Sequence, residues 1–203
     1  MVGNRREYPI VLIVCEGQAT EPTYFNAITD HLRLAAITIR GAKGSAPLTV
    51  VQDAVESKEK RDKQANHGAS TAAYDQVWCV FDVDQHPKLK DAIALAARHQ
   101  IKIAMSNPCF EYWLLLHFER FATTRQSRNQ MRRQLGKHIS QYRKGGDYGH
   151  LLLPKLKDAV GHAADIWKTQ WKITKPSPSD AMEKNPSTLV HTLIEYLTQP
   201  SPP

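Results

Sequence analysis

The stretch Tyr8-Pro-Ile-Val-Leu-Ile-Val-Cys15, followed directly by Glu16-Gly17, decides the fold class. An unbroken run of apolar, largely β-branched residues is typical of a strand that is buried on both faces of a parallel sheet. Three more stretches have strand character, the first of them short: Ile37–Arg40, Gln76–Phe81 and Ile101–Met105.

Candidate helices separate these strands. Glu21-Pro22, Pro47 and Pro87 each place proline where a first helical turn is expected, and apolar residues follow at helical spacing. The resulting order β-α-β-α-β-α-β predicts an α/β fold with a mostly parallel sheet flanked by helices, in which the crossovers are right-handed.

The chain changes character after a strongly apolar helix expected at Phe110–Phe118. The stretch from 120 to 149 is basic and polar, and 151–171 has the pattern of a long helix. Thr174–Asp180 has the composition of a linker, and Asn185-Pro186 predicts the N-terminus of a last helix. We therefore expect an α/β core at 1–119 and a basic, mainly helical extension at 120–203 that packs on it as one compact domain.

Composition excludes several classes of protein. With 203 residues, 41% hydrophobic residues and three cysteines, the chain is neither disordered, collagen-like nor a disulfide scaffold. Cys15, Cys79 and Cys109 lie in apolar runs, which favours reduced, buried thiols. Because no stretch approaches the ~20 apolar residues of a membrane span and the start lacks a signal-peptide pattern, we expect a cytoplasmic protein without membrane contact.

The positive charge is concentrated in one region. Between Arg120 and Lys157 ten basic residues face one acid, a net charge of +9 in 38 residues, so the rest of the chain sums to −2. Such a block favours a polyanion such as nucleic acid, although a solvated helical face would have the same composition. The candidate nucleic-acid-binding residues are Lys43, Arg125, Arg128, Arg132, Arg133, Arg143 and Lys144, of which Arg125, Arg128 and Arg132 have helical spacing.

Acidic residues stand where two of the expected strands end. Glu16 follows the first strand, and Asp82 and Asp84 end the third. Ligands of open α/β sheets bind beyond the carboxyl ends of the strands, and clustered carboxylates suit Mg²⁺ or Mn²⁺. The alternative is that Asp82 caps the next helix while Glu16 is merely solvated.

Several motifs resemble known families. The stretch 14–21 resembles the first motif of a Toprim domain, in the variant with a second acid, and Phe81-Asp-Val-Asp84 resembles its DxD motif. More narrowly, four segments together resemble the RloB-like family, which is related to bacterial abortive-infection proteins: Val14–Phe25 (VCEGQATEPTYF), Trp78–His86 (WCVFDVDQH), Ser106–Phe118 (SNPCFEYWLLLHF) and Asn185-Pro-Ser-Thr188.

This resemblance implies a Toprim-type nuclease of phage defence. Glu16 would be a general acid/base or metal ligand, Asp82 and Asp84 would coordinate the metal, and Glu21 matches the second acid that helps to hold it. The implied substrate is DNA or RNA, including tRNA, and an ATPase or another defence protein is an implied partner. The sequence leaves the oligomeric state open.

Other residues carry two interpretations each. Glu111 is either a further catalytic carboxylate beside the DxD motif or a complement to a helix dipole. Asn107 either reaches the phosphate or only forms the turn before Pro108. His86 either donates to a phosphate or is an exposed loop residue, and His117 is expected in the core or against a partner. Two further functions stay open, a non-catalytic nucleic-acid- or partner-binding subunit and a receiver-like phosphoacceptor module.

Overall fold

A five-stranded sheet forms the centre of the protein. The computed structural model describes residues 9–66, 72–83 and 88–199. The strand order is β2-β1-β3-β4-β5; β1 to β4 are parallel and β5 is antiparallel to β4. This confirms the predicted α/β fold with a mostly parallel sheet. The strands are β1 Val11–Cys15, β2 Ile37–Gly41, β3 Gln76–Asp82, β4 Lys102–Asn107 and β5 Ser187–Thr188.

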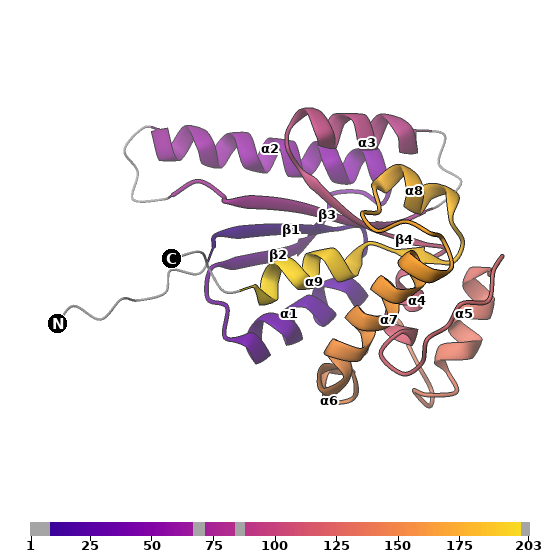
Figure 1. Cartoon of the computed structure of the whole chain (residues 1–203). Helices are drawn as coiled ribbons and strands as arrows, with labels where there is room; N and C mark the ends of the chain where they lie inside the picture. The colour runs from indigo at the N-terminus through magenta and orange to yellow at the C-terminus, as the bar shows by residue number, and fades with distance from the viewer. Residues whose placement is uncertain (1–8, 67–71, 84–87, 200–203) are drawn as a thin grey trace.

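Helices cover both faces of this sheet (Figure 1). On one face lie α2 (Pro47–Asn66) and α3 (Leu89–Arg98). On the other lie α1 (Thr20–Leu32), α4 (Phe110–Leu115), α7 (Leu156–Thr169) and α9 (Val190–Thr198). Strand alternation produces the two packed layers, because Val11, Ile13 and Cys15 of β1 face α1 while Leu12 and Val14 face α2.

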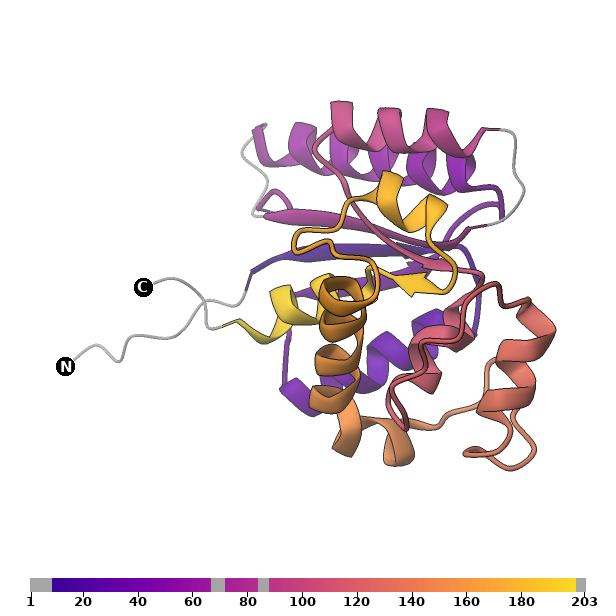
Figure 2. The same cartoon turned by 45° about the vertical axis from the view of Figure 1, so that its right-hand side comes forward.

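The second half of the chain is built into the same body. It contains α5 (Arg128–Leu135), α6 (Gly149–Leu152), the 3₁₀ helix η1 (Leu153–Lys155) and α8 (Pro178–Glu183). Met131 and Leu135 of α5 and Leu193 of α9 belong to the hydrophobic core that includes β1. Figure 2 shows α5 beside α4 at one end of the molecule.

Two sequence-based expectations near the C-terminus are wrong. Residues 174–180 are not only a linker, since α8 begins within them at Pro178 after a capping box formed by Ser177 and Asp180. Asn185-Pro186 does not begin the last helix. The Asn185 side chain instead donates to Asn107 Oδ1 and to the Gln126 carbonyl, and Ser187 and Thr188 pair with β4 as β5. The helix begins only at Val190.

The cysteine positions agree with the expectation from the sequence. All three cysteines are free and buried, and Trp113 and Trp167 are core residues. Across 9–66, 72–83 and 88–199, no helix has the length and apolar character needed to cross a bilayer.

His117 lies in the core on the α1 side of the sheet. Its Nε2 is 3.1 Å from the Tyr24 hydroxyl and its Nδ1 is 3.1 Å from the Trp113 carbonyl. Burial lowers the pKa of His117 to about 4, while hydrogen bonds that the imidazole donates to the backbone and the charge of Asp158 oppose the shift. His191 of α9 is also buried, and burial lowers its pKa to about 4.

Mild acid should therefore destabilise the protein. An unfolded histidine takes up a proton near pH ~6.5, whereas the buried one stays neutral to about pH 4, so stability present at pH 7 is lost as the pH falls between these values. At pH ~5 we expect a loss of about 2 kcal/mol for each of these two histidines. Urea denaturation of the wild type, His117→Gln and the exposed control His150→Gln measures it. An equal pH dependence in all three proteins would contradict the assignment to His117.

Candidate active site

Glu16 and Asp82 meet where two neighbouring parallel strands end. The Glu16 N–H continues the ladder by donating to the Val80 carbonyl at 2.8 Å, which fixes the residue just beyond β1. Its carboxylate crosses to β3, where Glu16 Oε2 accepts a hydrogen bond of 3.0 Å from the Asp82 N–H. Strand register thus brings together two acids that are 66 positions apart.

Two more acids come from the first turns of helices. Glu21 lies in the first turn of α1 and Glu111 in that of α4, and both are buried. Gly17 gives Glu21 its space, because a Cβ there would collide with the Glu21 carboxylate. A cavity of about 320 Å³ collects these groups. Its lining includes Glu16, Glu21, Asp82, Glu111, Arg128 and Lys144.

Burial and mutual repulsion raise the pKa of two of these acids, Asp82 and Glu21. Burial raises the pKa of Asp82 well above its usual range; Arg128 opposes the shift, while the charges of Glu21, Glu16 and Glu111 add to it. Burial also raises the pKa of Glu21, and a hydrogen bond from its own backbone N–H opposes this shift. Four carboxylates at one site carry more negative charge than a buried cavity holds without a cation.

Helix α5 brings two arginines to the acids. Arg128 Nη1 is 3.1 Å from Asp82 Oδ2, and Arg132 Nε is 3.1 Å from Glu111 Oε1. A capping box of Ser127 and Gln130 starts the helix, and the spacing of four residues puts both arginines on one face. The carboxylates lie deeper than the guanidinium groups: the exposed side-chain fractions are 10% and 3% for Asp82 and Glu111, against 30% and 40% for their arginines.

Lys144 also lines the cavity. Its loop is held against the start of α1, since the N–H of the next residue, Gly145, donates to Thr20 Oγ1 at 3.0 Å.

The other basic candidates lie elsewhere. Arg125 precedes α5 rather than sharing its face, and its N–H donates to the Asn185 carbonyl. Lys43 pairs with Glu56 at 2.7 Å. Arg133 lines a separate cavity beside Phe121. Arg143 is exposed, and neither Arg143, Arg125 nor Lys43 lines the cavity with the acids.

The described part of the site is not a ready-made metal centre. In the three described ranges, no three Asp, Glu, His or Cys side chains are arranged to hold a metal ion. Asp84 and His86 were candidates from the sequence and lie outside the described residues. The chemistry of the donor set nevertheless suits a hard divalent cation, because all four gathered acids offer carboxylate oxygens.

Comparison with protein families identifies the chain. A family model described as RloB-like protein matches residues 11–197, which include all four acids of the cavity and both arginines of α5. The chain belongs to the RloB-like family. It matches no curated protein and no solved structure.

Some residues of this RloB-like site could not be assigned from the sequence. Gln18, Thr20 and Ser45 line the cavity, and the only signal was that Gln18 and Thr20 fall inside the motif around Glu16. Asn107 takes a structural role, because its amide donates to the carbonyls of Ala181 and Met182 in α8.

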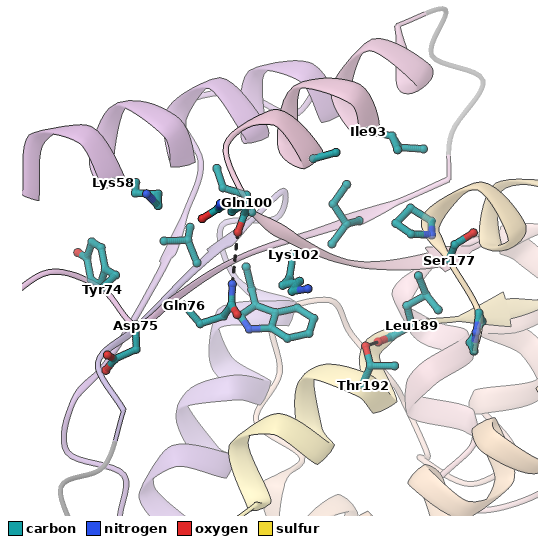
Figure 3. Close-up of a pocket in the computed structure, with 17 residues that line it drawn as sticks. Lys58, Tyr74, Asp75, Gln76, Ile93, Gln100, Lys102, Ser177, Leu189 and Thr192 are labelled. Carbon is teal, nitrogen blue, oxygen red and sulfur yellow. Dashed lines mark hydrogen bonds between the residues drawn. The ribbon is translucent and has the colours of Figure 1, made fainter. Parts of the chain in front are cut away.

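A larger hollow of about 950 Å³ lies at the opposite end of β3 and β4 (Figure 3). Lys102 of β4, Ile93 of α3 and Thr192 of α9 border it, and Gln76 donates to the Gln100 carbonyl across it. None of the acids or arginines described above lines it. In this RloB-like protein the four acids, Arg128 and Lys144 therefore line only the smaller of these two cavities.

Proposed function

We propose that this RloB-like protein is a metal-dependent, Toprim-type nuclease that hydrolyses phosphodiester bonds of nucleic acid in bacterial anti-phage defence. One observation carries the proposal: four carboxylates, two from the ends of β1 and β3 and two from the first turns of α1 and α4, line one cavity, and basic side chains stand beside them. This combination suits a reaction centre that receives an anionic backbone.

Glu16, Glu21 and Asp82, together with Asp84, would hold Mg²⁺ or Mn²⁺. The bound ion would supply Lewis-acid stabilisation of the scissile phosphate and a lowered pKa for water. Glu16 is the candidate general acid/base, since its carboxylate lies between the ends of β1 and β3. Glu111 is a further candidate carboxylate, and Arg128 and Lys144 would contact the phosphates.

Cleavage assays test this proposal. Plasmid DNA, single-stranded DNA and total tRNA are incubated with the protein in Mg²⁺, Mn²⁺ or EDTA. We expect the wild type to cut at least one of them only when a divalent ion is present. Glu16→Gln should lose this activity, because the amide can neither take up a proton nor neutralise the ion, whereas the exposed control Glu183→Gln should keep it. Cleavage that persists in EDTA or in the Glu16→Gln variant would contradict the proposal.

A second candidate is a non-catalytic nucleic-acid- or partner-binding subunit. The pairing of Asp82 and Glu111 with arginines favours it, because a vestigial site would keep its carboxylates neutralised in this way. Salt-sensitive binding to nucleic acid without cleavage under any ion would support it.

A receiver-like module is disfavoured. The sheet order resembles that of doubly wound phosphoacceptor folds, but such a module requires a basic side chain at a late parallel strand end. In this protein the last strand is antiparallel and consists of Ser187 and Thr188.

A further inference from the structure

Helix α5 contacts the acidic cavity through two ion pairs, and in each pair the arginine is more exposed than the carboxylate. The two carboxylates are buried and the two guanidinium groups reach them from the more exposed side. Arg128 and Lys144 line the cavity together with the four acids. Arg128 and Arg132 thus contact carboxylate oxygens that a bound cation would use, and Arg128 also lines the cavity.

We propose that Arg128 and Arg132 are displaceable counter-ions: they neutralise Asp82 and Glu111 while no metal is present, and they turn to the phosphates of nucleic acid once a divalent ion takes over the carboxylates. The inference rests on the proposed function and adds its regulation. Metal binding and nucleic-acid binding then reinforce each other, since each favours the same rearrangement of two side chains.

The local structure suits such an exchange. Arg128 and Arg132 are on the face of α5 toward the acids, while Met131 and Leu135 anchor the helix in the core, so only the flexible side chains need to move. In this state the carboxylates of Asp82 and Glu111 are both oriented toward arginine. A guanidinium group can bind either a carboxylate or a phosphate, often through two parallel hydrogen bonds.

Metal affinity gives the first test. Titration of Mn²⁺, followed by the EPR signal of the free ion at mildly alkaline pH, compares the wild type with Arg128→Gln and Arg132→Gln. Removing the competing charge should tighten Mn²⁺ binding by about three- to tenfold. Arg128→Lys keeps the charge and should stay near the wild type. Arg133→Gln, on the same helix but beside the separate cavity, is the matched control and should not change the affinity.

Nucleic-acid affinity gives the second test. In the Glu183→Gln and wild-type proteins, Mn²⁺ should strengthen binding of fluorescein-labelled oligothymidylate or labelled total tRNA by about fivefold or more, measured as anisotropy before cleavage proceeds. In the double variant Arg128→Gln/Arg132→Gln this gain should disappear. Thermal melting of each variant confirms that it is folded.

The outcomes separate this inference from the function on which it rests. If Mn²⁺ binds the wild type no better than a Glu16→Gln/Asp82→Asn double variant, both the metal site and the inference fail. If Mn²⁺ binds at the acids but the arginine variants bind it equally or more weakly, the nuclease proposal stands and the counter-ion role is overturned. If Mn²⁺ still strengthens nucleic-acid binding in the Arg128→Gln/Arg132→Gln variant, the proposed contact between these arginines and phosphate is overturned.

Discussion

Replacing Asp82 with Asn should lower metal-dependent cleavage by more than about 100-fold. Loss of an outer partner of a metal ligand already costs about 10- to 100-fold, and Asp82 is proposed as a direct ligand. The change replaces one carboxylate oxygen of the cavity with an amide nitrogen. The Asp82 backbone N–H still donates to the Glu16 carboxylate, because this hydrogen bond does not involve the Asp82 side chain. The substitution therefore tests chemistry while it keeps the contact between β1 and β3.

The fold should survive this substitution. Burial and the neighbouring acids disfavour the charged form of Asp82, so a neutral amide relieves repulsion even though Arg128 loses a partner. Initial rates of the Asp82→Asn variant are compared with those of Asp91→Asn, an exposed acid of α3. Activity within about threefold of the wild type would remove Asp82 from the proposed ligand set.

Replacing Trp113 with Ala should lower the free energy of unfolding by about 3–5 kcal/mol, as is typical for a fully buried aromatic side chain. Trp113 packs edge-on against Tyr24 of α1 and against His117, with ring centroids 6.4 Å and 5.1 Å apart. Its removal leaves a cavity between α1 and α4. These helices carry Glu21 and Glu111, so the loss should reach the site as well.

Urea denaturation measures this effect. Trp171→Ala is the matched control, because Trp171 is only partly buried and packs at the margin of both core clusters. We expect its cost to be less than half that of Trp113→Ala. Equal costs for the two variants would show that the contact between α1 and α4 is not a main source of stability.

The parallel sheet could be predicted because its strands are continuous in sequence and buried on both faces. β1 is apolar throughout, and β3 and β4 each have an apolar centre that is buried. Glu16 and Asp82 were therefore brought together by a general rule of α/β sheets.

What the sequence did not show depends on contacts between distant segments. β5 has two residues, too few for a periodic pattern, and is defined by its pairing with β4. The role of Asn185 likewise depends on Asn107, 78 positions away. The basic region was recognised as a block of charge. Only the tertiary fold shows that Arg128 and Arg132 reach Asp82 and Glu111, whereas Arg125 and Arg143 do not line the cavity with the acids.

The position of α9 has a consequence for protein synthesis. Leu193 and Leu197 of this last helix share a core with β1 and α1, which position Glu16 and Glu21, and β5 just before it completes the sheet beside β4. While α9 is still inside the ribosome, the layer that supports these acids lacks one of its walls. A partly made chain therefore lacks part of the packing that positions Glu16 and Glu21, and these acids reach their final places only after α9 has folded against β1 and α1.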